Sequence, residues 1–115
     1  MCRALRVLCV ADGREHLPEL KLATVSTSWE LVGGASSMSE LADQLETWRP
    51  DVVVVEASMG AEVVQLVRAR LESARIVAVG GTAPGADEVA PSMEDVRAAV
   101  LGLPRPGGPA RARGR

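Results

Sequence analysis

The 115-residue sequence has almost no aromatic side chains, since it contains no Phe, no Tyr and only two Trp. A hydrophobic core must therefore be built from aliphatic residues. These are plentiful, because 47% of the chain is hydrophobic. A chain of this length can bury one such core but not two, so the sequence predicts a single domain.

Cysteine and histidine are also scarce, which limits the chemistry available to the chain. The two cysteines, Cys2 and Cys9, would lie on opposite faces of one strand, so no disulfide is expected between them. The single histidine, His16, makes a zinc site improbable and is interpreted as a surface helix residue. Neither Ser58 nor Thr82 has a histidine nearby in the sequence. No catalytic residues are therefore assigned, and we expect the protein not to be an enzyme.

Long hydrophobic runs are absent as well. A membrane-spanning helix needs about 18 consecutive apolar residues or more, and no stretch comes near that length. The N-terminal stretch MCRALRVLCVADG is too short and too soon charged for a secretory signal. We therefore expect a cytoplasmic protein without a membrane partner, and no motif indicates a cofactor.

The charge of the chain is unevenly distributed. Residues 104–115, PRPGGPARARGR, hold four arginines and no acid, so the net charge of −2 leaves −6 for the remainder. This segment has no apolar periodicity, and we expect a disordered tail behind a domain formed by residues 1–103. We expect no nucleic-acid binding except nonspecific contact through the arginines of the tail. These are Arg105, Arg111, Arg113 and Arg115.

Apolar segments predict four buried strands, at residues 5–12, 29–36, 51–55 and 75–81. The third is apolar without alternation, which is typical of a strand buried on both faces, and Glu56 follows it directly.

Helices are predicted between these strands. Residues 38–49 carry a single apolar stripe at helical spacing, and Ser37 with Glu40 forms a capping-box pair at its start. Residues 61–71 carry a similar stripe.

Two further segments are assigned as helices on weaker patterns. In residues 13–28 a helix face with Pro18 in its first turn competes with strand-like alternation, and we favour the helix. A last helix is expected from Ser92, capped together with Asp95, to Leu103.

Strands that alternate with helices indicate a doubly wound, mostly parallel sheet with helices on both faces. In such folds the functional residues lie at the carboxyl ends of the strands. Asp12, Glu56 and the Gly80-Gly81 turn are therefore expected at one edge of the sheet.

The segments RVLCVAD, WELVGGASSMSELADQLETWRPDVVVVEASMG and ARIVAVGG together resemble the receiver domain of two-component response regulators. The resemblance covers residues 5–101, with good register as far as Gly80. It implies a flavodoxin-like (CheY-like) fold with strand order 2-1-3-4-5. It also implies a signalling role through other proteins.

The residues that carry receiver chemistry are mostly replaced. The resemblance places Glu56 where receivers have a phosphoaccepting Asp, and Ala11-Asp12 where they have two acids that hold Mg²⁺. Gly80 stands at the position of a Thr or Ser, with Thr82 two residues on. No Lys precedes Pro91, and the aromatic switch residue of the fifth strand is missing. The resemblance therefore implies a degenerate, atypical receiver that is not phosphorylated at Glu56.

The connection after the fourth strand also departs from the family. A receiver has a helix there, whereas GGTAP is all that precedes GAD in this chain. Parallel neighbours normally need a crossover of about a dozen residues. Residues 87–90, DEVA, are therefore left open as a fifth parallel strand. The uncovered edge is expected to contact a partner or a second copy.

Three interpretations of Glu56 stay open. It is a solvated acid at a strand end, a built-in mimic of the phosphorylated state, or part of a residual acidic pocket with Asp12 that binds Mg²⁺ weakly. The strand-end loop of Gly80, Gly81 and Thr82 is a weak candidate for cradling a phosphate with its backbone N–H groups.

The function predicted from these features is that of a stand-alone regulatory module in signalling or transcription control. It would act by phosphorylation-independent contact with another protein (a regulator, a kinase or a sigma-factor-type protein) or with itself as a homodimer. The expected surfaces are the last helix, residues 94–103, and the loops around Asp12, Glu56 and Gly81. The alternative is a small-ligand, nucleotide or metal sensor at the strand carboxyl edge.

Overall fold

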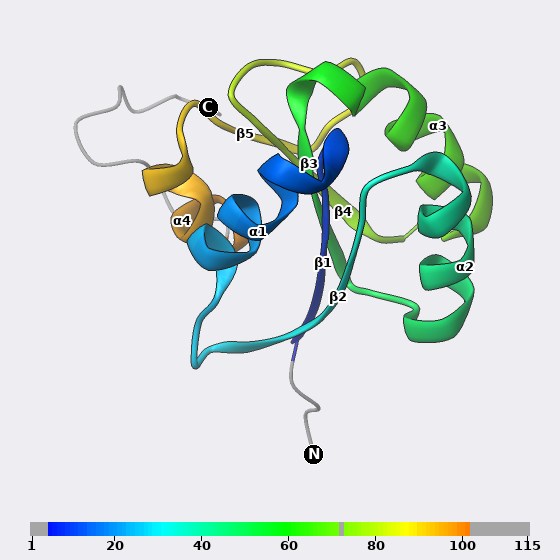
Figure 1. Ribbon diagram of the computed structural model, residues 1–115, viewed down its shortest axis with the longest axis horizontal. Coiled ribbons are helices and arrows are strands. Elements are labelled where there is room, and N and C mark those ends of the chain that lie inside the picture. Colours follow the sequence, from blue (N-terminus) through cyan, green and yellow to red (C-terminus); the bar gives the residue numbers. More distant parts are fainter. Residues whose placement is uncertain (1–4, 72, 102–115) are drawn as a thin grey trace, which may run out of the picture.

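A computed structural model describes residues 5–71 and 73–101, apart from the side chains of residues 13–15 (Figure 1). All five strands are parallel and form one sheet in the order β2-β1-β3-β4-β5, which confirms the predicted fold class and strand order. The strands are β1 (Leu5–Val10), β2 (Trp29–Ala35), β3 (Val52–Glu56), β4 (Arg75–Val79) and β5 (Glu88–Ala90).

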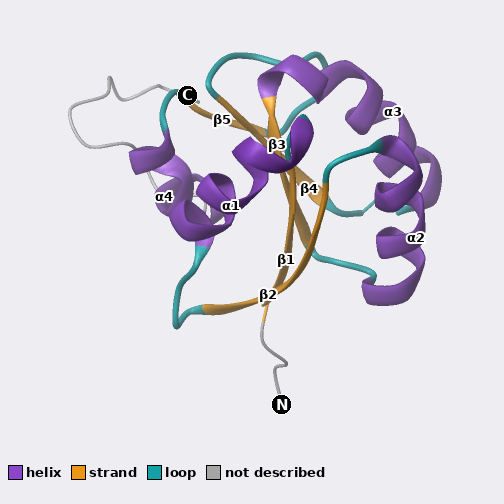
Figure 2. Cartoon of the chain, in the orientation of Figure 1, coloured by secondary structure: helices purple, strands orange, loops and turns teal. Residues whose placement is uncertain are grey.

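Helices cover both faces of this sheet. Helices α1 and α4 lie on one side of it and α2 and α3 on the other, so the domain has three layers (Figure 2). The helices are α1 (Gly13–Thr24), α2 (Met38–Trp48), α3 (Gly60–Arg70) and α4 (Val96–Leu101), with 3-10 turns η1 (Ala57–Met59) and η2 (Met93–Asp95).

The core consists of two aliphatic layers separated by the sheet. Successive strand residues point to opposite faces, so β3 contributes Val52 and Val54 to one layer and Val53 and Val55 to the other. All four valines are buried, as the continuous apolar run predicted. Trp29 is the one buried aromatic residue among those described, and its indole N–H donates to the carbonyl of Thr24 at 2.8 Å.

Residues 13–24 form the favoured helix and not a strand. However, Pro18 lies inside α1 and not in its first turn, because the helix already begins at Gly13. Several further predictions lie outside the described residues: those for Cys2, for the helix end at Leu103 and for the tail of residues 104–115.

The two predicted caps differ from each other in the structure. The Ser37 hydroxyl accepts the Glu40 N–H at 3.2 Å, while the Glu40 carboxylate accepts the N–H of Ser36, one residue earlier than a capping box requires. At the last helix the prediction was wrong: Ser92 donates its hydroxyl to the Asp95 carboxylate at 3.0 Å and accepts no helix N–H. The chain therefore enters α4 through the 3-10 turn η2.

Residues 88–90 are a true fifth parallel strand, which resolves the question that the sequence left open. They pair with residues 77–79 of β4, and residues 80–87 make the crossover without a helix. Asp87 starts the pairing, because its N–H donates to the carbonyl of Ile76 and its carboxylate accepts the N–H of Ile76. Asp51 bonds the main chain of Arg6 in the same way just before β3.

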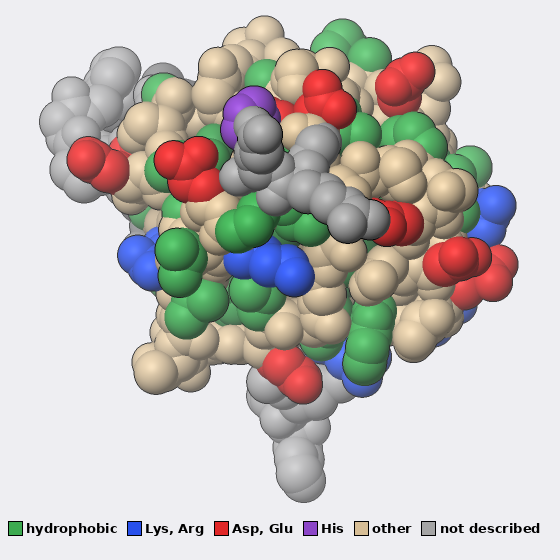
Figure 3. Space-filling model, viewed as in Figure 1, with side chains coloured by type: hydrophobic (Ala, Val, Ile, Leu, Met, Phe, Trp, Pro, Cys, Tyr) green, Lys and Arg blue, Asp and Glu red, His purple; other side chains and the backbone are tan. Residues whose placement is uncertain are grey.

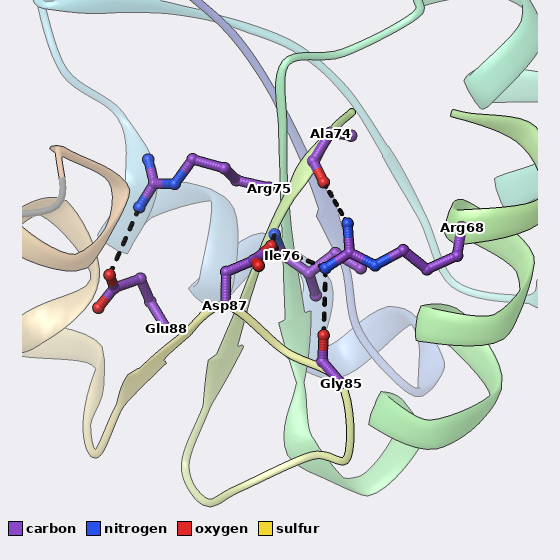
Figure 4. Close-up of polar contacts among 7 residues, drawn as sticks. All are labelled: Arg68, Ala74, Arg75, Ile76, Gly85, Asp87 and Glu88. Atoms are coloured by element: carbon purple, nitrogen blue, oxygen red, sulfur yellow. Dashed lines mark hydrogen bonds and ion pairs between the residues drawn. The ribbon is translucent and has the colours of Figure 1, made fainter. Parts of the chain in front are cut away.

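Arg68 of α3 holds this short crossover against the rest of the domain. Its guanidinium donates to the carbonyls of Ala74 at 2.8 Å and Gly85 at 3.1 Å, and it pairs with the Asp87 carboxylate at 2.9 Å (Figure 4). On the other side of the strand, Arg75 approaches Glu88 of β5 at 3.9 Å. The crossover is therefore joined to α3 and to the start of β4.

Two glycines allow the crossover to lie directly on α3. A Cβ on Gly60 would overlap the Cβ of Ala83, which is itself buried. Gly85 has a φ of 85°, and a Cβ there would also come within 2.8 Å of a Val64 methyl. The crossover thus occupies space beside α3, where we had expected an uncovered edge.

Arginines from other elements donate hydrogen bonds to carbonyls at the carboxyl ends of three helices. Helix ends leave carbonyls without helical partners, and a cation there also complements the helix dipole. The bonds run from Arg6 to Trp48 of α2 (2.7 Å), from Arg75 to Ala99 and Val100 of α4 (3.0 and 2.6 Å), and from Arg97 to Leu22 and Val25 at the end of α1 (3.1 and 2.6 Å).

We predict that Arg68→Ala lowers the free energy of unfolding by about 1–2 kcal/mol, because it removes hydrogen bonds to two carbonyls and one carboxylate. Arg70→Ala is the matched control on the same helix. It loses only an ion pair with Glu46 whose side chains are largely exposed, and should cost less than about 0.5 kcal/mol. Urea denaturation measures both variants, and equal losses would contradict the assigned role of Arg68.

We also predict that Gly60→Ala destabilises the protein by about 1–3 kcal/mol, because the new methyl group meets Ala83. A loss of stability would be informative, because replacing Gly by Ala inside a helix normally stabilises a protein. In an Ala83→Gly background the loss should shrink by at least about 1 kcal/mol, as measured by a double-mutant cycle. An unchanged loss in that background would show that the contact is not the cause.

Candidate functional site at the carboxyl edge of the sheet

The structure brings the predicted site residues to one edge, because the strands that carry them are parallel and adjacent. Glu56 is the last residue of β3 and pairs with Val79 of β4, and Gly80 follows directly. Asp12 stands between β1 and α1, next to the same edge. The Glu56 side chain is 24% exposed, so its carboxylate is accessible but not free in solvent.

The Glu56 carboxylate is engaged by its surroundings. One oxygen, Oε1, accepts the backbone N–H of Asp12 at 3.0 Å and lies 3.4 Å from the Ser58 hydroxyl. The other, Oε2, is 3.2 Å from Nδ1 of His16, whose side chain is 55% exposed. Glu56 therefore joins the first loop, helix α1 and the loop after β3.

His16 is the site residue that the sequence analysis missed. It lies in the first turn of α1, and helices that follow parallel strands begin at the carboxyl edge of the sheet. A helix assignment starting at Gly13 was enough to place it there. The interpretation of His16 as a surface helix residue overlooked that the first turn of this helix lies beside Glu56.

Asp12 contributes to this arrangement through its main chain. It is the N-cap residue of α1, although its side chain makes no capping hydrogen bond there. Among the described side chains, which leave out those of residues 13–15, no three of His, Cys, Asp or Glu gather as a metal site would require. Weak Mg²⁺ binding by Asp12 and Glu56 stays a prediction that rests on those two carboxylates.

A cavity of about 300 Å³ opens beside Glu56, and we call it the edge cavity. Its buried part is apolar and is formed by Ala11, Leu20 and Val79. The remaining lining residues are His16, Glu56, Ala57, Ser58, Gly80, Ser92 and Met93. The residues come from three strand ends, from α1 and from the start of η2, so the cavity exists only in the folded sheet.

Of the three residues in the predicted strand-end loop, one lines the edge cavity and two do not. Gly80 lines it with a φ of 86°, and no atom lies within 4 Å of the place that its Cβ would take. Gly81 instead lies against Ala57, and Thr82 is exposed and does not line the cavity. A phosphate cradle formed by all three residues stays a prediction, and Gly80 alone contributes to the cavity.

The described cysteine does not supply a nucleophile. Cys9 lies in β1 with no exposed surface, and burial raises the pKa of its thiol to about 11, against a smaller opposing effect of the Thr24 hydroxyl. The thiol therefore stays protonated near neutral pH and out of reach of a substrate.

None of the described helices is long and apolar enough to cross a membrane.

Comparison with known proteins finds similarity at the level of structure. No family model matches the sequence, and no curated protein matches it. The response regulator domain of Thermotoga maritima CheB superposes with a TM-score of 0.66 at 21% identity, over 86% of this chain and 92% of that one. The receiver domain of the putative response regulator NarL from Mycobacterium tuberculosis gives 0.68 at 23%, over 87% and 95%.

A protein outside this group has a similar backbone as well. A cobalamin-binding protein from Desulfitobacterium hafniense gives a TM-score of 0.66 at 16% identity, over 86% of this chain and 58% of that one. Together with the strand order, the superpositions with CheB and NarL show that the chain has the fold of a response-regulator receiver domain.

Proposed function

We propose that this protein is a receiver-like regulatory module that works by binding another protein, without phosphoryl transfer. The observation that carries the proposal is the set of contacts made by the Glu56 carboxylate. This residue occupies the strand-end position at which the receiver resemblance places the phosphoacceptor, and its carboxylate is already bonded to Asp12 and His16. It serves there as a structural tie between β3 and the start of α1.

The groups that phosphoryl transfer needs are not assembled around Glu56. Such a reaction requires a carboxylate nucleophile, Mg²⁺ and a cation that stabilises the transferred group. The chain has one lysine, Lys21, and its side chain lies against Gly34 of β2. Of the residues described in the structure, those that line the edge cavity include no Lys or Arg.

Contact with a protein partner is supported by an exposed apolar surface on α1 and α4, which we call the α1/α4 surface. Leu22 is 72% exposed, and Val25 and Leu101 are each 49% exposed. Arg97 links the two helices by bonding the carbonyls of Leu22 and Val25. Hydrophobic side chains gather where these helices lie, with Lys or Arg side chains beside them (Figure 3). Exposed apolar groups on adjacent elements are typical of interaction sites.

The partner proposed is a regulator, a kinase, a sigma-factor-type protein or a second copy of the chain. The α1/α4 surface includes part of the last helix that the sequence analysis put forward. A second function, as a small-ligand sensor, is supported by the edge cavity, whose volume is at the lower end of the range for small-molecule sites.

We predict that a small-molecule phosphodonor with Mg²⁺ adds no phosphoryl group to the protein, as followed by intact mass spectrometry. Glu56→Asp should behave in the same way, because shortening the side chain restores neither the cation nor the second acid. A receiver with an intact site serves as the positive control. A phosphoryl adduct on the wild-type chain at Glu56 would refute the proposed mechanism.

We also predict that Leu22→Glu and Leu101→Glu disrupt self-association or capture of the partner while leaving thermal stability nearly unchanged. Both side chains are exposed, so folding depends little on them, whereas a charge in an apolar interface is costly. Light scattering tests self-association and pull-down tests partner binding. Glu94→Lys, in η2, is the control. Unaltered association in both Leu variants would exclude the α1/α4 surface.

A further inference from the structure

The edge cavity combines an apolar interior with a single carboxylate at its side. Ala11, Leu20 and Val79 are at most 4% exposed and form the deep part. The hydroxyl-bearing residues Ser58 and Ser92 also line it. Acid side chains lie beside the histidine at the top of the view in Figure 3, where α1 begins.

Glu56 keeps the capacity to accept a further hydrogen bond. A carboxylate offers about four acceptor positions on its two oxygens. The Asp12 N–H and the Ser58 hydroxyl approach Oε1, and His16 approaches Oε2. At least one position on Oε2 therefore remains for a donor that enters the cavity.

We propose that the edge cavity binds a small organic cation, with one ammonium group on a compact apolar body. The ammonium would donate to Glu56 Oε2, and the apolar body would cover Ala11, Leu20 and Val79. A charge-assisted hydrogen bond to a partly buried carboxylate is stronger than a neutral one. Among the lining residues whose side chains the structure describes there is no Lys or Arg, and His16 approaches one position of Oε2.

Other ligand classes fit this lining less well. An anion would be repelled by the Glu56 carboxylate, and the described lining residues include no Lys or Arg to offset that repulsion. A divalent ion prefers six or more oxygen ligands, whereas the three buried lining residues have aliphatic side chains without oxygen. A nucleotide carries negative phosphates, which the Glu56 carboxylate would repel, and the described lining residues include no Phe, Tyr or Trp on which a base could stack.

This inference specifies the ligand of the sensor function proposed above and rests on it. The full chain, labelled with ¹⁵N, is titrated with benzylammonium chloride, benzyl alcohol and sodium benzoate, which share one apolar body and differ in charge. Amide shifts of Ala11, Gly80 and Met93 report on the cavity. We expect benzylammonium to move these amides with an affinity at least about tenfold above that of benzyl alcohol, and benzoate to move none.

Two charge-neutralising variants separate the cavity from the general acidity of the edge. Glu56→Gln should weaken benzylammonium binding about tenfold or more. It keeps an amide oxygen for the Asp12 N–H, so the fold should be preserved, as circular dichroism can verify. Glu62→Gln removes a charge from the first turn of α3, outside the lining, and should change the affinity less than about twofold.

The outcomes distinguish the ligand class from the sensor function. Equal binding of benzyl alcohol, or an unchanged affinity in a folded Glu56→Gln variant, would overturn the cation while leaving a small-ligand site. Shifts produced by MgCl₂ alone, with none from benzylammonium, would overturn it in favour of a metal site. Absence of cavity shifts with all of these probes would overturn both the cation and the sensor function.

Discussion

The arrangement of the carboxyl-terminal half of this domain depends on the ion pair between Arg68 and Asp87. The fifth strand forms only three residue pairs with β4, which is little for a sheet edge. Asp87 fixes the register of that strand by bonding both main-chain groups of Ile76, and Arg68 ties Asp87 to α3. The ion pair thus holds β5 against the rest of the domain, whereas a longer connection would hold it by packing a helix of its own. Gly60 and Gly85 make this possible, because they let the crossover lie directly against α3.

The position of β5 in turn decides the shape of the functional edge. The Gly80 N–H donates to the carbonyl of Ala90 at 2.8 Å, so the end of β5 is held beside the end of β4. The chain then passes Ser92 and Met93, which close one side of the edge cavity, before it enters α4. That helix is only six residues long, and Arg75 and Arg97 anchor it to the sheet and to α1. Arginine side chains thus hold this short helix in place next to a core that is mainly aliphatic.

The carboxylate at the centre of this edge is held by contacts within the domain. Glu56 is bonded to the first loop and to α1, and the edge cavity beside it has an apolar interior with Ser58 and Ser92 in its lining. The proposed role of this edge is recognition of a ligand or a protein. The fold by itself does not decide between these uses, since superpositions of similar quality include receiver domains and a cobalamin-binding protein.

The sequence by itself determined four of the five strands, most of the helices and their parallel order, because an uninterrupted valine run such as Val52–Val55 is stable only between two covered faces. It also identified Glu56 as the residue at the functional edge. Contacts between distant residues were decided only by the tertiary structure. Strand β5 forms because Asp87 bonds Ile76 and Arg68. The site forms because His16 contacts Glu56, forty residues later in the chain. Periodicity reports which face of an element is buried, whereas these contacts depend on where separate elements come together in space.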